Sequence, residues 1–111
     1  MNIKQRDEEV CPDEEEKDER MKSIYKYRIP STRCSLRLPK DATILSFQTQ
    51  NGVLVVWAII DTFEEITEER NFRLLGTGRP IPEDVELNYI GTTQQSIEPP
   101  LVWHLFEERK K

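Results

Sequence analysis

Two Gly-Thr pairs with nearby arginines are the residues of this sequence best suited to bind an anion. Gly76-Thr77-Gly78 is followed directly by Arg79, and Gly91-Thr92 lies further along the chain. Glycines leave backbone N–H groups accessible, and a guanidinium binds phosphate oxygens in a bidentate manner. Each pair is expected to end a strand. If the two ends are adjacent, their hydroxyls and Arg73 or Arg79 would form a small polar pocket.

The same glycines are also explained by a tight connection between two strands. In dinucleotide-binding and P-loop sites a helix begins directly after the glycines. Here Pro80 and Pro82 follow instead, so neither of those two sites is compatible with the sequence. A tight connection and an anion site of another kind both remain open.

His104 is the only side chain of the sequence whose free pKa favours proton transfer near neutral pH. It lies within a predicted strand, where a hydrogen-bonded structural histidine is expected. As the general base of a hydrolase it would need a nucleophile such as Cys34 close in space, and no Gly-x-Ser-x-Gly elbow is present. The acidic run at 61–69 has no apolar surroundings that would raise a carboxyl pKa. We therefore predict a protein that is not an enzyme.

Other side chains would suit nucleic-acid binding, but an ordinary structural role explains them better. Arg28, Arg33 and Arg37 flank the first predicted turn and form either a local basic edge or ordinary surface charge. The aromatic residues would suit a stacking platform for bases, but burial in a core explains most of them.

The negative charge of the sequence is confined to residues 1–20, which we call the acidic leader. This segment holds nine acidic and four basic residues, so its net charge of −5 equals that of the whole chain. Residues 21–111 are therefore neutral, and general binding to duplex DNA is not expected because it requires a basic face. With only Ile3 and Val10 as sizeable aliphatic residues, the leader is predicted to be disordered, while residues 21–111 form a single β domain.

Cysteine and apolar patterns predict a cytoplasmic protein that uses no metal and no cofactor. Cys11 and Cys34 give no disulfide framework, and beside a single histidine they show no zinc-ligand spacing. The longest apolar run, Val53–Ile60, is far shorter than the about 20 residues that span a bilayer. The first residues lack the pattern of a secretory signal.

Apolar residues alternate with polar ones at a period of two through most of residues 24–106, which predicts strands. Asn51-Gly52 supplies the positive φ angles of a two-residue type I′ hairpin, and Thr62 with Glu65 resembles the capping box of a short helix over 61–70. The fold class is predicted to be all-β, a small sandwich or partly closed barrel of about seven mostly antiparallel strands with at most one short helix. The expected strands cover residues 24–29, 34–38, 42–50, 53–60, 72–75, 85–89 and 101–106.

The strand expected at Val53–Ile60 is apolar at every position, so both of its faces must be covered. A chain of this size has little other material to cover the second face. We therefore expect either closure of a barrel or self-association into a homo-oligomer.

A resemblance to a known family rests on several short phrases in their order along the chain. These are Ile24-Tyr25-Lys26-Tyr27, Leu38-Pro39, Ile44-Leu45-Ser46-Phe47-Gln48, Trp57-Ala58, Phe72-Arg73-Leu74-Leu75-Gly76-Thr77-Gly78-Arg79-Pro80-Ile81, Tyr89-Ile90-Gly91-Thr92 and Val102-Trp103-His104-Leu105-Phe106-Glu107. Taken jointly, they resemble an uncharacterised family of small proteins from bacteriophages and bacteria. The resemblance spans about residues 22–107 and leaves the leader outside. It implies a stand-alone accessory protein of phage type and no particular activity.

Together these patterns predict a non-enzymatic accessory protein that engages a host protein or sequesters a small anionic ligand such as a nucleotide. A hydrolase with His104 as general base and a structural virion component are the alternatives. Protein recognition would use an exposed strand edge or an apolar patch, and a ligand would bind where subunits meet. The residues predicted to bind the ligand are Arg73, Thr77, Gly78, Arg79, Thr92 and His104.

Overall fold

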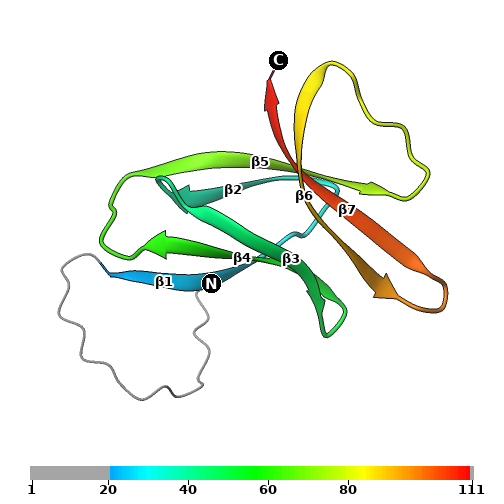
Figure 1. Ribbon diagram of the computed structural model, residues 1–111, viewed down its shortest axis with the longest axis horizontal. Helices are drawn as coiled ribbons and strands as arrows, with labels where there is room; N and C mark the ends of the chain where they lie inside the picture. Colours follow the sequence, from blue (N-terminus) through cyan, green and yellow to red (C-terminus); the bar gives the residue numbers. More distant parts are fainter. Residues whose placement is uncertain (1–20, 111) are drawn as a thin grey trace.

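The computed structural model describes residues 21–110, which form seven antiparallel strands in two sheets (Figure 1). One sheet has three strands in the order β1-β4-β3, and the other has four in the order β2-β5-β7-β6. The strands are β1 (Lys22–Arg28), β2 (Arg33–Pro39), β3 (Thr43–Gln50), β4 (Val53–Asp61), β5 (Thr67–Gly76), β6 (Val85–Ser96) and β7 (Leu101–Lys110). This confirms the all-β prediction and decides for a sandwich over a closed barrel. The predicted acidic leader lies outside the described residues.

The connection between β3 and β4 is the two-residue hairpin that the sequence predicts. Asn51 and Gly52 have φ angles of 53° and 79°, and the strands on either side pair from Gln50 with Val53 onwards. Both turn residues have positive φ, as a type I′ turn requires, because its twist matches that of the flanking strands.

The core lies between the two sheets and is made by alternate residues of their facing strands. From β4, Val56 and Ala58 are fully buried, and from the opposite sheet Phe72 and Leu105 are buried to the same degree. The remaining core residues are Tyr27, Ile29, Leu38, Ala42, Phe47, Leu54, Ile60 and Leu74. Apolar residues at every second position of each strand therefore supply the main stabilisation.

The outer face of β4 is partly covered by side chains of the same chain. Lys26 lies opposite Trp57 in the register, with its ammonium 5.4 Å from the centroid of the indole ring, and it also donates a hydrogen bond to Gln50 Oε1. Its aliphatic stem therefore crosses the row of β4 side chains, and Val55 in that row is only 2% exposed. Val53, at the end of the row, remains 38% exposed. The second face of β4, which was expected to be covered by barrel closure or by self-association, is thus covered in part by a long side chain of the same chain.

The prediction of a short helix over residues 61–70 is wrong. Asp61 ends β4 and Thr67 begins β5, and residues 21–110 contain no helix at all, hence none that could cross a membrane. The N–H and the hydroxyl of Thr62 both donate to the carbonyl of Met21 instead of capping a helix. The first residues of β5 pair with β2, from Thr67 opposite Pro39 onwards. Sheet pairing between distant segments therefore outweighs the local helix signal.

Strand β6 continues beyond Gly91, where the sequence predicts that it ends. Its register with β7 shifts between Tyr89 and Gly91, and the pairing then continues to Ser96. A Cβ on Gly91 would lie 3.3 Å from the Cβ of Phe47 on β3, so this glycine allows β6 to pack closely along β3. Thr92 consequently lies inside a strand and not at a strand end.

Candidate functional site

His104 links two of the predicted ligand-binding threonines on the outer face of the four-stranded sheet. Its Nε2 lies 2.8 Å from Thr77 Oγ1 and its Nδ1 lies 2.9 Å from Thr92 Oγ1. The Tyr89 hydroxyl is hydrogen-bonded to Thr92 in turn. The register explains the arrangement, because His104 on the central strand β7 lies opposite Thr92 on β6 and opposite Leu75 on β5.

This network supplies hydrogen-bond donors and acceptors at the surface. A neutral imidazole donates from one nitrogen and accepts at the other, and a threonine hydroxyl can serve either need. The hydroxyls of Thr77 and Thr92 hold the two ring nitrogens of His104 and so position its ring. Cys34 lies on β2 beside Arg33 and Phe72, and burial raises the pKa of its thiol.

A small cavity of about 270 Å³ adjoins this network. The chain reverses direction at Gly76–Arg79, where the Arg79 N–H donates to the Gly76 carbonyl at 3.1 Å and Gly78 has a φ of 92°. Such an angle strains a residue with a side chain, which explains the glycine. The cavity is lined by Leu75, Gly76, Thr77, Gly78, Arg79, Ile81, His104 and Phe106.

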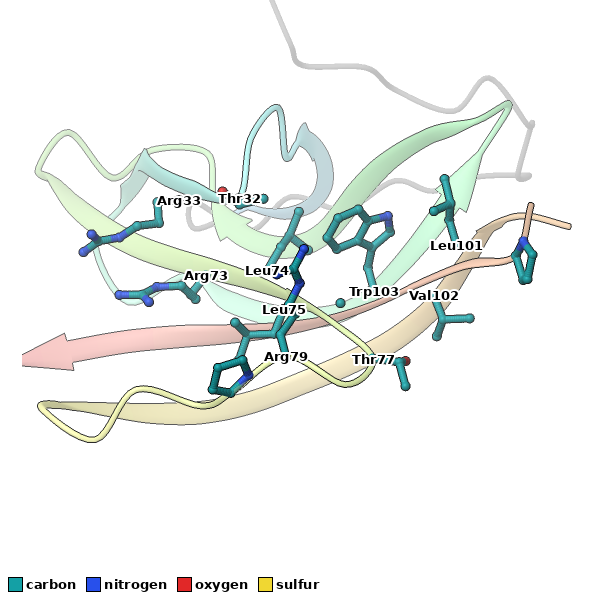
Figure 2. Close-up of a pocket in the computed structure, with 13 residues that line it drawn as sticks. Thr32, Arg33, Arg73, Leu74, Leu75, Thr77, Arg79, Leu101, Val102 and Trp103 are labelled. Carbon is teal, nitrogen blue, oxygen red and sulfur yellow. The ribbon is translucent and has the colours of Figure 1, made fainter. Parts of the chain in front are cut away.

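A larger cavity of about 770 Å³ lies at the end of β5 (Figure 2). Strand β2 pairs with β5 only as far as Arg33 opposite Arg73. Beyond that point, residues 74–76 have β7 as their only partner strand, and one backbone hydrogen bond, from Leu74 N–H to the Thr32 carbonyl, continues the pairing. The cavity occupies this unpaired edge. Its lining comprises Thr32, Arg33, Arg73, Leu74, Leu75, Gly76, Thr77, Arg79, Pro80, Pro100, Leu101, Val102 and Trp103.

Among residues 21–110, three arginines and no acidic residue line the larger cavity. Glu108 binds two of them from one side, with its carboxylate 3.2 Å from Arg33 Nη2 and 3.2 Å from Arg73 Nε. Within residues 21–110, Arg79 takes part in no ion pair. The three guanidinium groups and the single carboxylate therefore leave a surplus of two positive charges.

The structure brings the six predicted ligand-binding residues into two neighbouring places. Thr77, Gly78, Arg79 and His104 line the small cavity, and Thr92 adjoins it through its bond to His104. Arg73 belongs to the larger cavity only and is held by Glu108. Thr77 and Arg79 line both cavities, so the two adjoin at this turn.

Arg33 and Trp103 also line the larger cavity, although neither is among the residues predicted to bind a ligand. Arg33 was one of three arginines near a predicted turn, and nothing in the sequence distinguished it from Arg37. Its role depends on the register that places it opposite Arg73. Trp103 packs against the core on the same face of β7 as the buried Leu105, and it also borders the larger cavity.

Comparison with known proteins gives a family and no activity. No curated protein and no solved structure matches the chain. A known domain matches residues 21–111, which is the segment predicted to form the β domain. The resemblance to an uncharacterised family is thereby confirmed, and the chain belongs to the family defined by the domain of unknown function DUF7352.

Proposed function

We propose that this domain is a non-enzymatic binding module that captures a small phosphate-bearing anion in the larger cavity. The observation that carries the proposal is the convergence of three arginines on a concave surface to which the described part of the chain contributes no acidic residue. The volume of about 770 Å³ falls within the range typical of small-molecule sites. A surplus of positive charge in a partly enclosed site favours an anion over a neutral ligand.

The arginines differ in how firmly they are held, and this suits capture of an anion. The side chain of Arg73 is 16% exposed and is fixed by two contacts with Glu108. The side chain of Arg33 is 66% exposed, and Arg79 is exposed as well. One guanidinium is thus pre-positioned while two can adjust to phosphate oxygens, which arginine binds in a bidentate manner.

The network around His104 extends the same site on the outer face of the sheet. Thr77 is shared between the two cavities and is hydrogen-bonded to His104. Thr77 thereby adds a hydroxyl to the arginines that line the site. We propose a cytoplasmic setting, which is compatible with the free thiol of Cys34.

The proposal predicts that inorganic tripolyphosphate stabilises the protein in a thermal-shift assay, because a ligand that binds only the folded state raises the melting temperature. Replacing Arg79→Gln should weaken binding by about tenfold, since a charge-assisted contact is lost. Isothermal titration calorimetry measures the affinity of both proteins.

Arg37→Gln is the matched control, because Arg37 lies on the same strand as Arg33, does not line the cavity and bonds Thr67 instead. It should bind tripolyphosphate as the unchanged protein does. An equal loss in the Arg37 and Arg79 variants would show unspecific attraction by surface charge and would refute the proposed site, as would the absence of any binding.

A hydrolase with His104 as its base is the competing interpretation, and one substitution separates the two. His104→Gln retains hydrogen-bonding capacity toward Thr77 or Thr92 but cannot act as a base. We expect it to change tripolyphosphate affinity by less than about fivefold and expect no phosphate release from either protein. Phosphate release by the unchanged protein that disappears in the variant would establish an enzyme.

A further inference from the structure

We infer that the anion bound in the larger cavity is a nucleotide, with its phosphates beside the arginines and its base against Trp103. The inference rests on the proposed function and adds the chemical class of the ligand. A bare phosphate uses one end of the cavity only. The lining of the other end suits a planar, largely apolar group attached to that phosphate.

The cavity has a charged end and an apolar end. Arg33 and Arg73 lie at one end in Figure 2, and Trp103, Leu101 and Val102 lie at the other. Along β5, the register places Arg73 opposite Arg33 and Gly76 opposite Trp103. Three residues of a strand separate these positions by about 10 Å. The separation calls for an elongated ligand.

The indole of Trp103 is fixed in place by a chain of hydrogen bonds. Its Nε1 donates to Gln95 Oε1 at 2.8 Å, and the Gln95 side-chain amide donates to the carbonyl of Gly52 at 2.9 Å. The polar atom of the indole is therefore occupied. What remains for the cavity is aromatic carbon, which binds a planar base by stacking or by edge contact.

The absence of a side chain at Gly76 keeps the passage between the two ends open. A Cβ at this position would lie 3.7 Å from Trp103 Cζ3 and 3.9 Å from Arg79 Cγ. These are ordinary contact distances, so alanine is tolerated there without strain. It would, however, fill the space between the indole and the arginine that a ligand spanning both must cross.

The apolar end continues past Trp103 along the start of β7. Pro100, Leu101 and Val102 line it, and Leu101 is 40% exposed. No cation lies among these residues. Their surface gains nothing from phosphate but gains from contact with an apolar ring, which removes it from water.

The experiment compares adenosine triphosphate with inorganic tripolyphosphate, both without divalent cations, by calorimetry on the unchanged chain. Adenosine triphosphate should bind about tenfold more tightly, because the stacked base adds to the shared phosphate contacts. Replacing Leu101→Ala should reduce this advantage without changing tripolyphosphate affinity. Ile97→Ala is its control, since Ile97 is 78% exposed and does not line the cavity.

A fluorescence titration tests the position of the base directly. The chain has two tryptophans, so in a Trp57→Phe variant the emission comes from Trp103 alone. Adenosine triphosphate should quench or shift this emission and tripolyphosphate should not. Gly76→Ala in the same background should weaken the nucleotide response more than tripolyphosphate affinity.

The outcomes separate the inference from the proposed function. Equal affinities for the two ligands, with the emission of Trp103 unchanged, would overturn the nucleotide inference and leave the anion site in place. Binding of neither ligand would overturn both. Equal binding of adenosine and adenosine triphosphate, independent of Arg79, would also overturn both, since the arginines would then have no role.

Discussion

At the scale of single residues, the firmest polar contact of the fold lies away from the candidate site. Arg70 binds Glu107 through two hydrogen bonds of 2.7 and 2.9 Å and donates to the carbonyl of Ala42 at 2.6 Å. The hydrogen bond to Glu107 raises the pKa of the guanidinium. Both side chains are less than 20% exposed. Each charged group has therefore lost much of its hydration, and its contact with the other compensates for that loss.

Replacing Arg70→Met should therefore lower the free energy of unfolding by about 2 kcal/mol, because Glu107 is left as a largely buried carboxylate without its partner. Urea denaturation measures the change. The double variant with Glu107→Leu should recover most of the loss, since it removes the stranded charge. A single variant as stable as the unchanged protein would show that water already solvates Glu107 adequately.

Two weakly acidic side chains, the half-buried Cys34 and the buried Tyr27, are expected to make stability fall at alkaline pH. Burial raises the pKa of the Cys34 thiol, and burial together with the neighbouring Tyr25 raises the pKa of the Tyr27 hydroxyl. Each group ionises more readily in the unfolded chain than in the folded one. At a pH below the pKa of the unfolded chain, both states are protonated and the group does not affect stability. Above that pKa, ionisation favours the unfolded chain. The free energy of unfolding should fall as the pH rises from about 8.5 to 11.

Urea denaturation across this pH range tests the expectation. Cys34→Ala should remove the part of the decline that begins near the ordinary thiol pKa, and Tyr27→Phe the part that begins at higher pH. A decline that is identical in both variants would assign the effect to other groups.

At the scale of elements, the hairpin at Asn51-Gly52 provides a test of backbone conformation that is separate from packing. A Cβ on Gly52 would meet nothing within 4 Å, yet the residue has a φ of 79°. Gly52→Ala should cost about 1 kcal/mol through that angle alone. Gly76→Ala is the matched control, because its φ is not positive and its Cβ meets only ordinary contacts. Equal melting temperatures for the two variants would contradict this explanation.

The strands and the hairpin were predictable from the sequence because their signals are local. Alternation places Tyr27 and Phe47 in the core as expected, and the turn residues require positive φ whatever surrounds them. The region 61–70 was not predictable in the same way. Its polar residues carry a capping pattern, and only the pairing of Thr67 onwards with a distant strand makes it extended. A local helix propensity is outweighed where another strand supplies hydrogen bonds to the backbone.

At the scale of the whole molecule, the candidate site results from the order of strands in the four-stranded sheet. The order β2-β5-β7-β6 places β7 between β5 and β6, which is why His104 reaches both Thr77 and Thr92. The sequence suggested that these three residues meet, but it contained no signal for the strand order. The partnership of Arg33 with Arg73 and Glu108 depends on that order entirely, so it was not predictable.

Self-association remains a prediction, and the outer face of the three-stranded sheet is the surface on which we expect it. Ile24 is 52% exposed and lies opposite Ile59, which is itself only half-buried. Lys26 and Arg28 lie on the same face by alternation, so two copies that meet there bring like charges together. Association should therefore strengthen with added salt, which screens the repulsion while apolar contact persists.

Light scattering on the protein at rising concentration and rising sodium chloride measures this association. The mass should increase along both axes, and Ile24→Lys should hold the protein at the monomer mass by adding charge to the contact. Ile97→Lys, at a position that is even more exposed but outside this sheet, should behave as the unchanged protein does. A monomer mass under every condition would contradict self-association. It would mean that Lys26 and its neighbours in the same chain cover the outer face of β4 sufficiently.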